Sequence, residues 1–201
     1  MEPNSVHTKD KIFSTALRLF AINGYENVSV RTIADVVGIK VSSIYNHFEN
    51  KEQILEACYK YYIDNRYLAR LGREQYEPII KNGTKDEIIR IINYEYHESV
   101  MDNMIMALLV VFSRIYTDTK ASDILADEIN NALAYQKEFF WTGIEVGRFA
   151  EFDIEPVGLI YLGSRMFYAQ CATLKPEQRS SWRDAELSVN AELLKLIPFK
   201  Y

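Results

Sequence analysis

The sequence contains only two cysteines among its 201 residues, Cys58 and Cys171, and no Cys-x-x-Cys spacing. A disulfide framework or a cysteine zinc site is therefore not expected, and we predict two buried free thiols in a reducing compartment. The three histidines form no His-Glu-x-x-His pattern, and no paired carboxylates accompany them. A nucleophile-elbow pattern is also missing, so the residues indicate no catalytic site, metal ion or cofactor.

Long apolar segments are missing as well. No run of 18 apolar residues exists, so no transmembrane helix is predicted. The first ten residues are polar and lack the apolar centre of a signal peptide, which leads us to expect a cytoplasmic protein that does not contact a membrane. Hydrophobic residues nevertheless make up 48% of the chain and charged residues 25%, which is typical of a globular protein with a real core.

The chain has no excess of positive charge. Its net charge at neutral pH is −5. Residues 1–52 carry six basic and six acidic side chains, so the whole negative balance lies in residues 53–201. Overall charge therefore gives no evidence of a nucleic-acid partner, and such a partner has to be inferred from local geometry.

Strand patterns, internal repeats and low-complexity tracts are absent, and the periodicity of the chain is helical. Apolar residues at three- and four-residue spacing predict a first helix that ends at Gly24. Ser29 is expected to cap a second helix, which Gly38 ends. A short third helix is predicted at about 41–47.

The later helices follow from similar signals. A long fourth helix is predicted from Asn50 to Pro78, and Thr84 with Glu87 forms a capping-box pattern ahead of a fifth. Residues 104–112 are all apolar and predict a helix that is buried on every side. The remaining boundaries are a helix from about 122 to 146 that stops at Gly147, one that begins near Pro156 and one that ends before Pro198.

These helices predict an all-α fold with a small three-helix domain over residues 1–50 and a larger six-helix domain over residues 51–201. In the small domain, Ala34, Gly38 and Ile44 have the spacing of a helix-turn-helix. That motif requires a small residue where its helices cross, a residue tolerant of positive φ in the turn, and an apolar side chain on the second helix. Any tight helical hairpin has the same requirements, so the triplet alone does not establish DNA binding.

The predicted third helix has a polar outer face. At about 100° per residue, Val41, Ile44 and Phe48 point inward. The outward positions hold Ser42, Ser43, Tyr45 and Asn46, with His47 at the edge. Short hydroxyls, an amide and a phenol can reach base edges and phosphates in the major groove. We therefore expect this face to contact double-stranded DNA.

The stretch from Phe13 to Leu55 contains LFAINGYENVSVRTIADVVGI and then SIYNHFENKEQIL. It resembles the DNA-binding domain of the tetracycline-repressor (TetR) family nearly position for position. The resemblance covers about a quarter of the chain, and beyond it only the helix pattern and the segment IEVGRF are similar to the family. It implies a regulator whose N-terminal domain binds operator DNA and whose larger domain binds a small molecule and dimerises.

The resemblance also implies which side chains contact DNA. Ser29 and Arg31, at the start of the second helix, match positions that hold the phosphate backbone. Ser43 matches a position, usually threonine, that contacts DNA from the third helix. The N-terminus of the fourth helix favours anions because its N–H groups are exposed. The remaining matches are to positions that bind phosphates. They are Tyr45, His47 and Lys51, and Lys51 lies at this start of the fourth helix.

Two positions depart from the family pattern. Lys40 stands where serine or threonine is common; it provides no side-chain cap but adds a charge near the DNA backbone. Val41 stands where a polar or basic residue is frequent, and it either packs internally or touches a thymine methyl group. Because of these departures, the preferred base sequence does not follow from the resemblance.

By resemblance, the predicted helices five to seven enclose a ligand cavity. Glu95 and Gln136 each lie on an otherwise apolar helix face there. A carboxylate is costly to bury without a partner, so Glu95 pairs with an arginine such as Arg114, lies at a solvent edge or contacts the ligand. In the last case, with Phe112 and Phe140 among the lining residues, the cavity suits a mostly apolar, cationic aromatic effector.

By the same resemblance, the predicted helices eight and nine pair with their copies in a homodimer. Helix eight has an apolar stripe from Val157 to Cys171, and helix nine carries Trp182, Val189 and Leu193. Either stripe can equally belong to the internal core. A dimer also fits the geometry of DNA, because two copies of the predicted third helix about 34–36 Å apart meet successive major grooves of a palindromic site.

The sequence thus predicts a ligand-responsive transcriptional repressor, which a small effector releases from its palindromic operator. Two alternatives belong to other classes of protein: a helical adaptor that binds a partner protein, and an enzyme on an all-helical fold. An activator with the same fold is a third. Salt-dependent binding to duplex DNA distinguishes a regulator from the first two.

Overall fold

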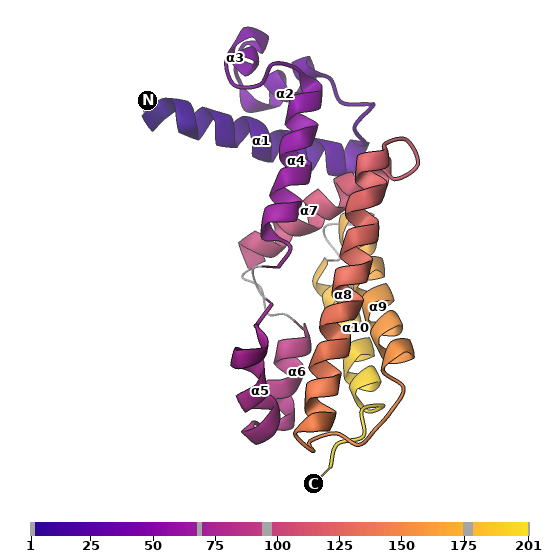
Figure 1. Cartoon of the computed structure of the whole chain (residues 1–201). Coiled ribbons are helices and arrows are strands. Elements are labelled where there is room, and N and C mark those ends of the chain that lie inside the picture. Colours follow the sequence, from indigo (N-terminus) through magenta and orange to yellow (C-terminus); the bar gives the residue numbers. More distant parts are fainter. Residues whose placement is uncertain (1–2, 68–69, 94–97, 175–178, 201) are drawn as a thin grey trace. The chain divides into compact units, whose positions relative to one another are not determined.

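The computed structural model describes residues 3–67, 70–93, 98–174 and 179–200 (Figure 1). Within these ranges the chain is helical, and its β structure is limited to an isolated antiparallel bridge between Phe149 and Phe199. The predicted all-α fold class is therefore confirmed. The described helices are α1 (Pro3–Asn23), α2 (Val30–Val37), α3 (Val41–Tyr45), α4 (Lys51–Asn65), α5 (Arg73–Asn82), α6 (Lys85–Asn93), α7 (Glu98–Arg114), α8 (Thr119–Glu145), α9 (Ile154–Leu174) and α10 (Arg179–Leu194).

The chain forms two compact units, each with its own core. Unit 1 consists of Met1–Arg66 and His97–Leu125, and unit 2 consists of Tyr67–Tyr96 and Ala126–Tyr201. Helix α7 thus belongs with the N-terminal helices, whereas α8 begins in unit 1 and continues in unit 2. The two units are defined by how the helices pack. The predicted division into a DNA-binding domain up to residue 50 and a ligand-binding domain after it stays a prediction.

The core of unit 1 is built around α7. The apolar run from Met104 to Phe112 packs against α1 and α4, and all of its residues are buried except the part-buried Leu108 and Phe112. The prediction that this run forms a helix is confirmed, and seven of its nine residues are buried as expected. The other helices of unit 1 contribute their apolar faces to the same core, with Ile12, Leu17, Phe20, Ile33, Ile44, Ile54 and Leu55 among the buried side chains.

Most predicted helix ends are confirmed. Helix α1 ends directly before Gly24. At the start of α4, the backbone N–H of Gln53 donates to the Asn50 side chain at 2.8 Å. Before α6, the Thr84 N–H donates to Glu87 Oε2 at 2.7 Å, and the Glu87 N–H donates to Thr84 Oγ1 at 3.2 Å. These reciprocal bonds form the capping box that the residue types predict.

The prediction of one long helix from Asn50 to Pro78 is wrong. Helix α4 ends at Asn65, and the separate helix α5, which contains Pro78, begins after Gly72. The Gly72 N–H donates to Gln75 Oε1 at 2.9 Å, which satisfies one of the free donors at the new helix start. Apolar residues continue at helical spacing across the break, so periodicity did not reveal it. The break adds one helix to the six expected in the larger domain.

Unit 2 has an aromatic core. The ring centroids of Tyr76 and Phe139 are 5.1 Å apart, and those of Phe139 and Phe140 are 5.6 Å apart in an edge-to-face arrangement. Helices α9 and α10 pack side by side (Figure 1). The C-terminal segment is fixed to the loop between α8 and α9, where the Ala150 N–H donates to the Pro198 carbonyl at 2.7 Å.

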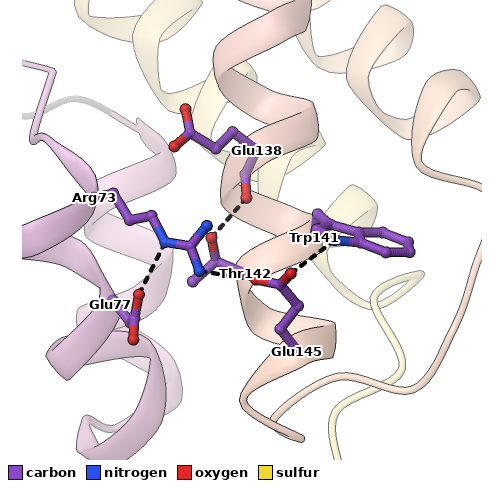
Figure 2. A network of polar contacts seen from close by, with 6 residues as sticks. All are labelled: Arg73, Glu77, Glu138, Trp141, Thr142 and Glu145. Carbon is purple, nitrogen blue, oxygen red and sulfur yellow. Dashed lines mark hydrogen bonds and ion pairs between the residues drawn. The ribbon is translucent and has the colours of Figure 1, made fainter.

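An ion-pair network joins α5 and α8 within unit 2 (Figure 2). Arg73 Nε donates to Glu77 Oε2 at 2.9 Å, and Arg73 Nη2 donates to Glu145 Oε2 at 2.8 Å. Trp141 Nε1 donates to Glu145 Oε1 at 3.0 Å. About two fifths of each charged side chain is exposed, so water competes with these ion pairs and limits their contribution to stability.

The two cysteines are free and buried, which confirms the expectation of two separate thiols. Burial raises the pKa of the Cys58 thiol to about 12, so this thiol is protonated near neutral pH. In the described part of the chain, no group of three or more His, Cys, Asp or Glu residues is placed to hold a metal ion. None of the described helices is both long and apolar enough to cross a membrane.

Candidate nucleic-acid interface

Helices α2 and α3 form the helix-turn-helix that the residue spacing predicts. Gly38 ends α2 with φ +78° and ψ 34°, a left-handed conformation that residues with a Cβ adopt only at a cost. The N–H groups of Gly38 and Ile39 donate to the Ala34 carbonyl at 2.9 and 3.0 Å. Ala34 is fully buried, and Ile44 inserts into the core from α3. All three residues of the triplet thus have the structural roles that the motif requires.

The outer face of α3 is polar and accessible. Ser42, Tyr45 and Asn46 are exposed, and 52% of Tyr45 is accessible to solvent. Ser43 is part-buried. The side chains that pack against the core of unit 1 from this segment are Val41, Ile44 and Phe48. The packing of Val41 agrees with its interpretation as an internal contact, and Ser42, Tyr45 and Asn46 are open to solvent.

The residues predicted to hold phosphates beside α3 are also accessible. Ser29 is the N-cap of α2, where the Thr32 N–H donates to Ser29 Oγ at 3.0 Å. Arg31, in the first turn of α2, is exposed. Lys40 is the exposed N-cap residue of α3 and makes no side-chain capping bond, as its side chain predicts. Two cations therefore stand at the beginnings of the two helices of the motif.

Lys51 and His47 are part-buried. Lys51 is the first residue of α4, and its Nζ lies 3.9 Å from the centroid of the Tyr25 ring. Burial lowers the pKa of Lys51 from its ordinary value, and the nearby Glu26 carboxylate opposes that shift. His47 lines an open cavity of about 610 Å³ in unit 1, together with Lys9.

The surroundings of Lys51 were not predictable from the sequence. Tyr25 OH donates to Glu52 Oε2 at 2.7 Å. The guanidinium carbon of Arg114, the last residue of α7, lies 4.9 Å from the Tyr25 ring centroid. Arg114 also forms an ion pair with Glu26, 88 residues away in the sequence. Contacts between residues so far apart leave no periodic signal, so only the fold reveals this cluster.

The four predicted ligand-binding residues lie in different parts of the chain. Glu95 is outside the described residues. Phe112 is part-buried and belongs to unit 1, whereas Phe140 is buried in the core of unit 2. Gln136, also in unit 2, is 6% exposed and lines a pocket of about 390 Å³. Gln136 thus lies at a pocket of unit 2, as predicted for a ligand-binding residue.

The buried triplet beneath an exposed polar face is typical of a helix-turn-helix domain. Residues 12–58 match a family model described as bacterial regulatory proteins of the tetR family. A segment of 72 residues is 42% identical to the biofilm operon icaADBC negative transcriptional regulator IcaR of Staphylococcus epidermidis. That segment covers 34% of this chain and 38% of the relative, so the match spans well under half of the relative's length.

Solved structures of similar fold extend over nearly the whole chain. The TetR-family regulator PfmR from Thermus thermophilus is 19% identical with a TM-score of 0.67, covering 92% of this chain and 97% of that chain. A regulator from Saccharomonospora viridis, solved in complex with choline, is 18% identical with a TM-score of 0.65, covering 94% of this chain and 96% of that one. The N-terminal segment is therefore similar to the tetR family of bacterial regulatory proteins, and nearly the whole chain shares the fold of these solved structures.

Proposed function

We propose that the chain is a ligand-responsive transcriptional repressor that binds a palindromic DNA operator as a homodimer in the bacterial cytoplasm and has no enzymatic activity. The observation that carries this proposal is the exposed polar face of α3, with Ser42, Tyr45 and Asn46, above the buried Ile44. A helix fixed by its inner face can place its outer side chains in the major groove without losing its fold. The negative regulator IcaR, which is 42% identical over a 72-residue segment, supports repression as the direction of control.

The residues that we assign to DNA contact, exposed or part-buried, differ in the part of DNA that each can reach. Ser42, Ser43 and Asn46 carry short hydroxyl and amide groups that suit base edges. The phosphate contacts that we assign are Ser29, Arg31, Lys40, Tyr45, His47 and Lys51. Phosphate contacts fix register and supply affinity, whereas base contacts supply sequence preference. Because the chain is acidic as a whole, affinity for DNA depends on these few placed groups.

Exposed apolar side chains on α9 and α10 support the homodimer. Leu159, Ile160 and Phe167 on α9 are about half exposed or more, and so are Val189 and Leu196 near the end of the chain. Apolar side chains gathered on two neighbouring helices are typical of an interface that a second copy covers. A two-fold dimer presents two copies of α3 to a palindromic site.

The pocket in unit 2 is our candidate for the effector site. Its volume of about 390 Å³ falls among small-molecule sites, which measure roughly 300–1,000 Å³. The aromatic residues Trp141 and Phe152 line it, and the acidic residues Asp153 and Glu155 there outnumber the one basic residue, Lys137. Aromatic faces and carboxylates both attract cations, so the pocket favours a mostly apolar effector that carries a positive charge.

Gln136 gives this pocket a buried polar group. Its Oε1 atom is buried and accepts no hydrogen bond from the described residues. The side chain approaches Gly158 so closely that a Cβ there would lie 2.8 Å from Oε1. An amide oxygen that accepts no hydrogen bond from the described residues, at the wall of a pocket, is suited to orient a polar ligand that carries a donor. The contacts predicted for Glu95, Phe112 and Phe140 stay predictions.

Helix α8 is the element that we propose to carry the effector signal. It holds Gln136 in unit 2, and its first turn belongs to unit 1. Lys120 in that turn forms an ion pair with Glu56 on α4, and Tyr59 OH donates to Asp118 Oδ2 at 2.8 Å. An effector that prefers one pose of α8 therefore shifts α4. A coupling of about 1–3 kcal/mol changes operator affinity roughly 5- to 150-fold.

The test is a selection of bound duplexes from a random DNA library by the purified chain, followed by titration of the selected duplex at several salt concentrations. We expect a palindromic site whose affinity falls steeply as salt rises. Arg31→Ala should weaken binding and lower the salt slope by about one. Arg73→Ala removes an arginine of unit 2 that is also exposed, and it should change neither quantity.

Failure to enrich any duplex, or an affinity indifferent to salt, would overturn the proposal. An equal loss in the Arg31→Ala and Arg73→Ala variants would show that binding follows general charge and not the helix-turn-helix. Turnover of a substrate by a chain that does not bind DNA would support the enzyme alternative.

A further inference from the structure

One buried tyrosine ring in unit 1 contacts two cations. Tyr25, in the turn between α1 and α2, is 8% exposed. The Lys51 ammonium lies 3.9 Å from its ring centroid, and the Arg114 guanidinium carbon lies 4.9 Å from it. The ring of Phe20 packs edge-on against Tyr25 at 5.1 Å, which restrains the tyrosine. Three elements, the turn after α1, the start of α4 and the end of α7, therefore meet at one aromatic side chain.

Two carboxylates lie close to this ring, and one of them pairs with a cation. Arg114 forms an ion pair with Glu26. Glu52 accepts a hydrogen bond from Tyr25 OH at 2.7 Å. Cations attract the face of an aromatic ring within about 6 Å, and the attraction strengthens as water is excluded. Two cations at one ring also repel each other, so the position of Lys51 depends on how Arg114 is paired.

We propose that Tyr25 is a positioning residue for DNA binding: its ring holds the Lys51 ammonium at the N-terminus of α4, and Arg114 keeps the Glu26 carboxylate from drawing that ammonium away from phosphate. This rests on the proposed function, in which Lys51 contacts a phosphate. A free lysine side chain loses much conformational entropy when it is fixed, and a side chain already held at the ring has less to lose.

The position of Arg114 gives this cluster a link to the rest of unit 1. Arg114 ends α7, and α7 packs along α1 and α4. A displacement of the end of α7 therefore changes the charge next to Lys51 directly. The strength of the proposed contact between Lys51 and a phosphate then depends on how α7 packs in the core of unit 1. Lys51 itself is not part of that core.

The test is a double-mutant cycle on operator affinity, measured by fluorescence anisotropy over a range of salt concentrations. Lys51→Ala should lower the salt slope by about 0.9, the value of one phosphate contact. Tyr25→Leu should weaken binding roughly three- to tenfold and lower the slope similarly. In the Lys51→Ala background, Tyr25→Leu should cause no further loss. Tyr25→Phe keeps the ring and should bind within about twofold of the unaltered chain.

The proposed role of Arg114 is tested by changing Arg114 alone and together with its ion-pair partner Glu26. Arg114→Gln should weaken binding because it frees the Glu26 carboxylate, and Arg114→Gln combined with Glu26→Gln should recover most of the loss. Lys60→Ala is the matched control: Lys60 is also on α4, but its side chain is 76% exposed and pairs with Asp64. It should leave both affinity and salt slope unchanged.

Because Tyr25→Leu removes a buried ring, NMR of the unaltered chain provides a readout that does not depend on folding of a variant. Protons next to the Lys51 ammonium should be shifted upfield by the ring current of Tyr25, and those of Lys60 should not. Absence of that shift, or fully additive losses in the cycle, overturns the inference. If the unaltered chain binds no duplex, the proposed function fails instead, while the NMR result still decides whether the ring holds Lys51.

Discussion

At the scale of single residues, the sequence predicts those roles that depend on near neighbours. Ala34, Gly38 and Ile44 follow from the geometry of one turn, and the structure gives each of them the expected role. The contact between Lys51 and Tyr25 does not follow in this way, because residues 26 positions apart meet only after the helices pack. The chemistry of neighbouring residues was therefore sufficient to identify the motif. The groups around Lys51 could be identified only from the folded structure.

The hydroxyls of Tyr45 and Ser43 should affect DNA binding differently. Tyr45→Phe removes one exposed phenolic oxygen and should weaken binding to all duplexes by a similar factor, about two- to tenfold, since phosphates are common to every sequence. Ser43→Ala removes a hydroxyl near base edges and should change the preferred base at one position, with a discrimination of about 1–3 kcal/mol. Random-library selection with each variant measures both effects. A changed sequence preference in Tyr45→Phe would show that the assignment of contacts is wrong.

At the scale of elements, periodicity predicted helices well and their ends only where a capping group was present. Asn50, Thr84 and Glu87 mark real helix starts. The break between α4 and α5 was not predicted, because apolar residues keep their helical spacing across it. The helix nevertheless ends at Asn65. Contacts distant in sequence hold the segment after the break: Arg70 Nη2 donates to Glu128 Oε1 at 3.2 Å.

Arg70 and Arg73 allow a matched test of this segment, because both are arginines that pair with a glutamate of α8. The Arg70 and Glu128 side chains are 13% and 12% exposed, so Arg70→Ala leaves a poorly hydrated carboxylate and should lower the free energy of unfolding by about 2–3 kcal/mol. Arg73→Ala breaks the exposed network of Figure 2 and should have little effect. Urea unfolding followed by circular dichroism measures both. Equal losses would contradict the argument from burial.

At the scale of the whole molecule, the sequence did not separate core residues from interface residues on the last helices. The predicted stripe of α9 contains buried Val157 and Tyr161 together with exposed Ile160 and Phe167. Both sets are apolar, and a helix that packs on its own core and on a second copy has two apolar faces. Exposure in the folded chain distinguishes the two sets, and the exposed set is the one that we assign to the proposed dimer interface.

The exposed set on α9 should be required for dimerisation. Phe167→Glu places a charge on a side chain that is 62% exposed in the single chain and that the proposed dimer buries. Because an unpaired charge in an interface is costly, we expect a monomer at micromolar concentration and an operator affinity at least about tenfold lower, since the two half-sites are no longer bound as one unit. Tyr116→Glu introduces the same charge at an aromatic residue that is 94% exposed in unit 1, and this variant should stay dimeric. Sedimentation equilibrium gives the mass of each variant, and circular dichroism verifies that both are folded. A folded Phe167→Glu variant that remains a dimer with unchanged operator affinity would place the interface elsewhere on the chain.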